Sequence, residues 1–228
     1  MAGLAGEAFV AIWHDIVSEG KAEFYAWHTR QHIPERLGVA GFLRGRRYLA
    51  ERGTPEYFNL YEVQTADVLT GAEYLARLND PTPWTQRALP YFRNVSRSLC
   101  RVGASFGRSQ GGVILTVRAE AVAGEEERLA RFLADEALPQ LFDQPGVVGA
   151  HYGVADRSGS EIVTAERKAR GDVTRVPGWV ILLEGESQAA VEEAARGLSS
   201  LEERGAQGPL AQGTYRLECC LSRAGHGE

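Results

Sequence analysis

The sequence predicts an α+β fold with two tandem β-α-β-β-α-β repeats, whose antiparallel sheets face each other as a barrel-like sandwich. The first observation behind this prediction is an internal repeat, because residues 24–42 and 129–147 align without a gap. The second is that the same order of strand and helix patterns occurs in both halves of the chain. The matched positions include Phe24 with Leu129, Trp27 with Phe132, Pro34 with Pro139, and Gly41 with Gly146.

The first repeat opens with a strand over residues 9–16, because this segment is rich in aromatic and β-branched residues. A helix over residues 19–37 follows, with its large side chains on one stripe. We expect this helix to end near Gly38, where glycine permits a left-handed cap. Pro34 predicts a kink or an earlier stop.

A hairpin comes next, formed by strands over residues 41–50 and 57–64, with the intervening ERGTPE as a tight turn. Thr65 is the expected N-cap of a helix over residues 67–78. A proline-rich segment then leads to a closing strand over residues 94–102, which completes the first repeat.

The second repeat has the same order of elements and begins near the glycine-rich segment FGRSQGG. We therefore assign residues 1–106 to one ferredoxin-like unit and residues 107–228 to another. A polar insertion over residues 155–178 replaces the short turn of the first repeat, and we expect it to form an exposed, mobile hairpin extension. The expected elements are strands over 113–119, 147–154, 179–184 and 215–222, and helices over 125–141 and 188–201.

The predicted architecture has a natural place for a ligand. Each ferredoxin-like sheet carries helices on one face and leaves its other face to be covered. Two sheets that face each other solve that problem for both repeats. The expected product encloses a cavity between the sheets, and such a cavity is the default ligand site.

Histidine occurs in only one copy of the repeated helix. His28 and His32 align with Leu133 and Ala137, which suggests a chemical half and a scaffold half. Four residues apart on a helix, the two imidazoles project from one face. Imidazole titrates near neutral pH, so both residues are candidates for general acid–base catalysis. The alternative is that both are hydrogen-bonded residues of a packed interface.

Further side chains are candidates for binding a substrate. Arg44 and Arg46 share one face of a predicted strand, and arginine in a cavity would bind a carboxylate, phenolate or enolate. His14 joins the helix histidines if its strand face lines the cavity, and is a core residue if that face meets the helices. The full set of substrate-binding candidates is His14, Arg44, Arg46, Tyr57, Asn59, Tyr61, Trp84 and Arg97.

We expect no bound cofactor and assign no metal ligands, with haem or a divalent metal as the alternatives. His28 and His32 would need a third ligand to hold a metal ion. The sequence offers His14, Asp15 or Glu35 for that role but places none of them beside the pair.

Composition and motifs exclude several classes of function. The net charge is −5 with no basic run, which argues against binding to nucleic acid or an anionic membrane. No segment approaches the roughly 18 apolar residues of a membrane span, and no signal-peptide pattern is present. Three cysteines without metal-type spacing fit a reducing cytoplasm. Phosphate-loop, dinucleotide and nucleophile-elbow motifs are missing from the sequence.

The pattern W-H-x-x-x-H-x-P-E-R-L-x-V-x-G-F, at residues 27–42, resembles the dimeric α/β-barrel superfamily, and within it EthD-like and related bacterial proteins. Residues 74–99 also resemble stretches of those proteins. The superfamily includes cofactor-independent monooxygenases, muconolactone isomerases, polyketide cyclases, aldoxime dehydratases and haem enzymes such as chlorite dismutases. These haem enzymes take an axial histidine from their second repeat, where this chain has no histidine on the helix and has His151 on a strand. The resemblance therefore implies the fold more strongly than one reaction.

We therefore predict a small-molecule enzyme without a bound cofactor, which performs acid–base chemistry on an aromatic or polyketide-like substrate. Isomerase, cyclase, lyase and cofactor-free monooxygenase reactions all fit. The alternatives are a non-catalytic protein that binds a hydrophobic ligand, and a haem- or metal-dependent oxidoreductase. The repeat can pair its own sheets, so a homodimer through other surfaces is compatible with the fold but not required by it.

Overall fold

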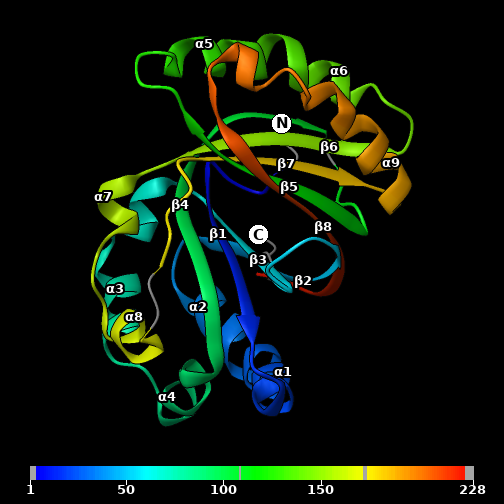
Figure 1. Cartoon of the computed structure of the whole chain (residues 1–228). Helices are drawn as coiled ribbons and strands as arrows, with labels where there is room; N and C mark the ends of the chain where they lie inside the picture. Colours follow the sequence, from blue (N-terminus) through cyan, green and yellow to red (C-terminus); the bar gives the residue numbers. More distant parts are fainter. Residues whose placement is uncertain (1–3, 108, 172–173, 224–228) are drawn as a thin grey trace, which may run out of the picture.

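The computed structural model describes residues 4–107, 109–171 and 174–223. Within these ranges, eight strands form one closed antiparallel barrel in the order β1-β3-β2-β8-β5-β7-β6-β4 (Figure 1). The first half contributes its strands in the order β4-β1-β3-β2, and the second half contributes β8-β5-β7-β6. The same ferredoxin-like strand order therefore occurs twice, and the predicted fold class is confirmed.

The helices lie outside the barrel, with α1 to α4 on one side and α5, α6 and α9 on the opposite side (Figure 1). None of the helices in the described ranges combines the length and apolar composition that a membrane span needs. The first half contains β1 (Ala8–Ile16), η1 (Ser18–Gly20), α1 (Lys21–Trp27), η2 (His28–His32), α2 (Ile33–Gly38), β2 (Phe42–Arg52), β3 (Tyr57–Val63), η3 (Ala66–Leu69), α3 (Ala72–Asn79), α4 (Pro83–Ala88), η4 (Leu89–Tyr91) and β4 (Phe92–Gly107). The second half contains β5 (Val113–Ala121), α5 (Glu126–Arg131), η5 (Phe132–Ala137), α6 (Leu138–Phe142), β6 (Val147–Ala155), α7 (Arg157–Ser160), α8 (Ala165–Arg170), β7 (Trp179–Gly185), α9 (Gln188–Ala194), η6 (Ala195–Leu198), η7 (Glu202–Arg204) and β8 (Ala206–Ser222).

Strands β4 and β8 are longer than predicted because each pairs with both halves of the chain. β4 pairs with β1 and β6, and β8 pairs with β2 and β5. These pairings join the halves along both edges of their sheets. Since the halves share one barrel, the division into domains at residues 106 and 107 stays a prediction.

The interior of the barrel is packed with large side chains. Trp13 points inwards from β1 against Phe58, and its indole N–H donates to Thr116 Oγ1 of the second half at 3.0 Å. Tyr48 and Tyr215 lie in the same buried cluster. The predicted cavity between the sheets is therefore wrong, because aromatic side chains of both halves occupy that space.

The interior also holds a buried ion cluster. Arg46 contacts Glu62 and Glu184, each at 2.8 Å, and Arg44 Nε donates to Glu62 at 2.8 Å. His151 Nε2 lies 3.8 Å from Glu184 Oε1. Two carboxylates thus balance two guanidinium groups, which is the condition for keeping such charges away from water. These two arginines stabilise the barrel interior.

The helix that carries the candidate histidines continues past Pro34, so the predicted earlier stop is wrong. Between α1 and α2 it widens into a π-turn, η2, in which the Ile33 N–H donates to the carbonyl of His28. The backbone directly before the proline is therefore already out of the i→i−4 register, where the ring would clash. The second half has the same π-turn, η5, directly before Pro139.

Two other helix boundaries differ in detail from the prediction. Gly38 is the last helical residue, but the glycine with a left-handed backbone is Gly41, with φ of 87°. Thr65 makes no side-chain cap. The helix expected over residues 67–78 is divided into η3 and α3, since Gly71 has an extended conformation.

The insertion does not form an exposed hairpin. It folds into α7 and α8, and α8 lies beside α3 of the first half (Figure 1). The Ala165 N–H donates to Asn79 Oδ1 at 3.1 Å, and Glu166 forms a buried ion pair with Arg36. The predicted hairpin is wrong because Glu166, one of the polar residues of this segment, is not exposed. Its charge is neutralised by Arg36, which lies 130 positions earlier in the sequence.

Candidate functional site

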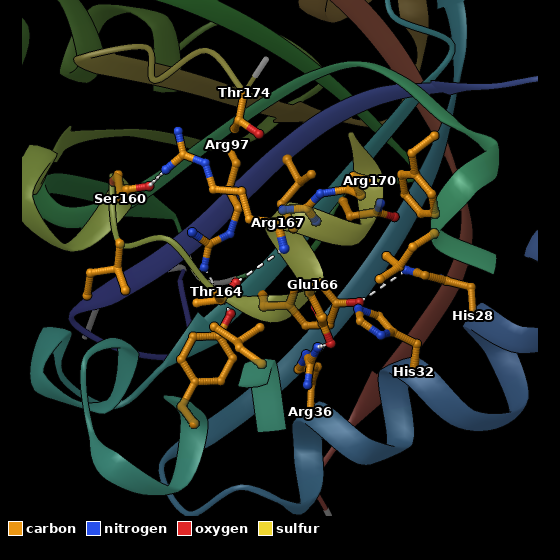
Figure 2. A pocket seen from close by; sticks show the side chains of 18 of the residues that line it. His28, His32, Arg36, Arg97, Ser160, Thr164, Glu166, Arg167, Arg170 and Thr174 are labelled. Atoms are coloured by element: carbon orange, nitrogen blue, oxygen red, sulfur yellow. Dashed lines mark hydrogen bonds and ion pairs between the residues drawn. The ribbon is translucent and has the colours of Figure 1, made fainter. Parts of the chain in front are cut away.

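A pocket lies outside the barrel, between the first-half sheet and the elements that cover it (Figure 2). Side chains of β1, β3 and β4 face η2 and α2, and the insertion closes the pocket from a third direction. The enclosed volume is about 40 Å³. This is room for one or two water molecules. A larger ligand therefore enters only if the insertion or the lining side chains move.

The π-turn η2 brings the rings of His28 and His32 to a centroid distance of 5.4 Å. Arg47 Nη1 lies 3.4 Å from His28 Nδ1, and Tyr61 Oη lies 3.1 Å from His28 Nε2. A guanidinium can only donate, so Nδ1 accepts, and the proton of the neutral ring is assigned to Nε2. His28 therefore donates to Tyr61 and leaves the phenol proton free to bond elsewhere.

His32 has a different environment. Its ring contacts that of Trp27 in a tilted arrangement, with 4.3 Å between centroids and an interplanar angle of 37°. Within the described ranges, no side chain or backbone group bonds to either of its ring nitrogens, and Nδ1 is buried. A neutral imidazole with an available lone pair is the chemical form that a general base requires.

The histidines of this region stay neutral at neutral pH. Burial lowers the pKa of His28 well below 6.5, and the charge of Arg47 adds to the effect. Burial, followed by the charge of Arg36, does the same to the pKa of His32. Burial also lowers the pKa of His14 to about 3. All three side chains are therefore proton acceptors and not cations at neutral pH.

Positive charge surrounds these neutral bases. Arg36, Arg97, Arg167 and Arg170 line the pocket, whereas the only carboxylate among the described lining residues is that of Glu166, which is paired with Arg36. Burial lowers the pKa of Arg170 to about 10, which leaves it charged at neutral pH. Neutral bases beside several guanidinium groups suit a ligand that is an anion or becomes one by losing a proton.

Replacing Glu166 with glutamine is expected to loosen the insertion. The change leaves the buried guanidinium of Arg36 without its carboxylate. Removing one partner of a buried ion pair costs about 3–5 kcal/mol, and α8 can relieve much of that cost by local opening. We expect hydrogen–deuterium exchange of peptides covering residues 164–171 to become at least tenfold faster.

Glu161→Gln is the matched control, because Glu161 is an exposed residue of the same insertion. Its exchange should equal that of the parent. Equal protection of residues 164–171 in the Glu166→Gln variant and the parent would show that the ion pair does not hold the insertion closed.

The structure brings together about half of the candidate residues named from the sequence. His14 is buried beside the pocket, with its Nε2 2.8 Å from Asn59 Nδ2. Tyr57 stacks on His14, and the Trp84 indole N–H donates to Glu23 at 2.8 Å, so neither lines the pocket. The candidate arginines of β2 lie in the interior ion cluster instead. The candidates that do line the pocket are His28, His32, Asn59, Tyr61 and Arg97.

Sequence reasoning misses four charged residues of the pocket. Arg36 stands four residues after His32 on the same helix, and this spacing is a signal that could have identified it. No such signal marks the residues of the insertion, because only the fold of the whole chain brings them to the first half. These residues are Glu166, Arg167 and Arg170.

In the part of the chain that the structure describes, no group of three His, Cys, Asp or Glu side chains is placed to hold a metal ion. The histidines of η2 are near arginines, and a cation would meet repulsion there. The charge of the pocket favours an anion.

No protein-family model matches the chain, and no curated protein sequence matches it. Solved structures share its fold. An anthrone oxidase-like protein has a TM-score of 0.64 at 11% identity, covering 98% of this chain and 96% of its own. A candidate monooxygenase from Fusobacterium nucleatum subsp. nucleatum has a TM-score of 0.60 at 9% identity, covering 96% of both chains. A candidate chlorite dismutase has a TM-score of 0.54 at 12% identity, covering 93% of this chain and 95% of its own. At such identities the likeness shows the ferredoxin-like fold alone.

Proposed function

We propose that this chain is a small-molecule enzyme that removes a proton from a phenolic or enolisable substrate, without a bound cofactor. The observation that carries the proposal is the buried, neutral His32, whose ring nitrogens bond to none of the described residues, in a pocket rich in arginine. The names of the similar structures, anthrone oxidase-like and monooxygenase, favour cofactor-free oxygenation over isomerase, cyclase or lyase chemistry.

In the proposed mechanism His32 accepts the proton of the substrate, and Arg36 stabilises the resulting enolate or phenolate. His28 holds Tyr61 so that its hydroxyl donates to the developing oxygen anion. Burial raises the pKa of Tyr61 above its ordinary value, so the phenol remains a donor. The substrate anion then reacts with O₂ while the closed insertion excludes water.

The helices of the second half contain no histidine that could serve as an axial ligand of haem. In the second half, Leu133 and Ala137 stand where the first half has histidines, and His151 is buried inside the barrel. No step of the proposed mechanism therefore runs through haem or a metal.

A non-catalytic binding protein is the second candidate function. The cover that the insertion gives the pocket supports it, since the insertion would retain a bound ligand as well as exclude water from a reaction. The two functions differ in one measurable property, which is the exchange of a substrate proton with solvent. A dimer formed through other surfaces stays a prediction in both cases.

Anthrone is a suitable test substrate because its ring CH₂ group loses a proton to give an aromatic enolate. One anthrone and one O₂ give one anthraquinone and one water. We expect protein-dependent oxygen uptake with anthraquinone formation, and exchange of the CH₂ protons in D₂O under anaerobic conditions by NMR.

Oxygen uptake and proton exchange together distinguish the candidate functions. Exchange without oxygen uptake would favour isomerase or lyase chemistry. If anthrone, simple phenols and β-diketones bind but neither exchange nor react, the proposal of an enzyme is wrong and the binding function is supported.

A further inference from the structure

The pocket contains more positive charge than its own residues neutralise. Arg36 is paired with Glu166. Arg97 donates to the hydroxyl of Tyr74 at 3.1 Å. Arg167 donates to the backbone carbonyls of residues 160 and 161. Arg170 makes no hydrogen bond or ion pair with any described residue, and its Nε is buried. Within the described ranges, three of the four guanidinium groups thus form no ion pair with a carboxylate, and the charge of Glu166 acts on Arg170 without direct contact.

Arg97, Arg167 and Arg170 are partly buried. A cation that is partly removed from water is stabilised by an opposite charge or by hydrogen bonds that replace its lost solvation. The positive field of Arg97 acts on Arg170, so the two charges are close enough to destabilise each other. One anion between them would relieve both the repulsion and the missing hydrogen bonds.

The two groups come from different halves of the chain. Arg97 projects from β4 of the first half, and Arg170 ends α8 of the insertion (Figure 2). An anion held by both would therefore also hold the insertion in its closed position. A ligand that binds only the closed form stabilises that form in proportion to its concentration and affinity.

We propose that Arg97 and Arg170 form an anion subsite that binds a carboxylate group of the substrate, with the charge of Arg167 supporting it. The proposal rests on the proposed function, because it assumes that the substrate enters this pocket. The substrate is then an aromatic acid with two distinct parts: a phenolic or enolisable group for His32, and a carboxylate for the two arginines. The planar fork of arginine matches a carboxylate with two parallel hydrogen bonds.

Salicylate and salicylamide are the probes, since they share a phenol and differ in one negative charge. Isothermal titration calorimetry at low ionic strength should give a dissociation constant for salicylate at least tenfold below that for salicylamide. Arg97→Gln and Arg170→Gln should each weaken salicylate binding about tenfold and leave salicylamide binding unchanged. Arg170→Lys should restore part of the preference, because it keeps the charge.

Lys168→Gln is the matched control, because Lys168 is an exposed residue of α8 and the substitution removes the same charge from the same helix. It should leave both dissociation constants at the parent values. Thermal melting identifies any variant that fails to fold.

Several outcomes would overturn the subsite. The subsite is wrong if the parent binds the two probes with dissociation constants within twofold of each other, or does not bind salicylate at millimolar concentration. It is also wrong if the Lys168→Gln variant loses as much salicylate affinity as the Arg97→Gln and Arg170→Gln variants. Inorganic phosphate that displaces salicylate at concentrations below the dissociation constant of salicylate would show that the subsite takes phosphate and not carboxylate.

The proposed function can fail separately. If the parent protein prefers salicylate but neither exchanges anthrone protons nor consumes oxygen, the proposed subsite is supported and the proposed enzyme function is wrong. If the parent protein turns over neutral anthrone but shows no preference for salicylate, the proposed enzyme function is supported and the proposed subsite is wrong.

Discussion

The His32→Asn variant is expected to exchange anthrone protons about 10²- to 10⁴-fold more slowly than the parent, which is the usual contribution of a positioned general base. Asparagine keeps a polar side chain in the pocket but has no basic lone pair. Salicylate affinity should change little, because the arginines and not the imidazole bind the carboxylate. Initial exchange rates in D₂O by NMR, with a salicylate titration alongside, check both expectations.

His28→Asn is the matched control, and its rate should fall only about tenfold. It removes the hydrogen bond that holds Tyr61, which is worth roughly 0.5–1.5 kcal/mol, and leaves the base in place. The parent rate should be flat from about pH 6.5 to 8.5, because the pKa of His32 lies well below 6.5. The assignment of His32 as the general base would be contradicted if the exchange rates of the His32→Asn and His28→Asn variants fell equally. A parent exchange rate that rises from pH 6.5 to 7.5 would also contradict it.

The second large effect expected is acid unfolding at unusually mild pH. His14, His28, His32 and His151 are buried, and burial lowers the pKa of each below its unfolded value of 6.5, to about 3 for His14 and about 4 for His151. Below pH 6.5 the unfolded chain therefore binds protons that the folded chain does not. Stability is complete above pH 6.5 and is lost as the pH falls towards the folded values.

The size of this effect follows from the number of histidines. Each one contributes a slope of up to about 1.4 kcal/mol per pH unit, so His14 and His151, with folded pKa values of about 3 and 4, together give about 3 kcal/mol per unit. The loss from these two at pH 5 is about 4 kcal/mol, a large part of the stability of a typical domain, and His28 and His32 add to it in the same direction. We expect urea-unfolding free energies to fall steeply from pH 6.5 to pH 5.

His14→Phe tests the origin of the slope. His14 is packed among aromatic rings, including Phe24 and Phe92, so phenylalanine approximates its shape. The variant loses its bond to Asn59 and is less stable at pH 7.5. Its slope should nevertheless correspond to one proton fewer than that of the parent. A stability that stays constant from pH 7.5 to pH 5 in the parent would show that the buried histidines do not control acid unfolding.

Most of the fold could be predicted from the sequence because local patterns repeat. Segments rich in aromatic and β-branched residues identified strands, and the match of residues 24–42 with 129–147 identified the repeated helix. The π-turns could not be predicted, because proline inside a helix normally indicates a break. The extra length of β4 and β8 depends on pairing with the other half of the chain, which local patterns do not contain.

The candidate site was predictable only where its residues lie on repeated elements. His28 and His32 were identified because the second copy lacks them. The candidate pocket lies on the opposite face of the sheet from the expected cavity, because alternation divides a strand into two faces without showing which one meets the helices. The charges of the insertion were missed for a different reason, since polar composition alone does not distinguish a solvated loop from a buried ion pair.

The contact between α8 and α2 has a consequence for how the protein assembles during synthesis. Arg36 and Glu166 are separated by 130 residues, so the pocket cannot close until β6 and the insertion have been translated and the second half has begun to fold. Contacts between such distant positions form late because chain entropy opposes them. A first half emerging alone would expose its aromatic and histidine side chains to solvent. The pocket would therefore close only after both halves of the chain have folded.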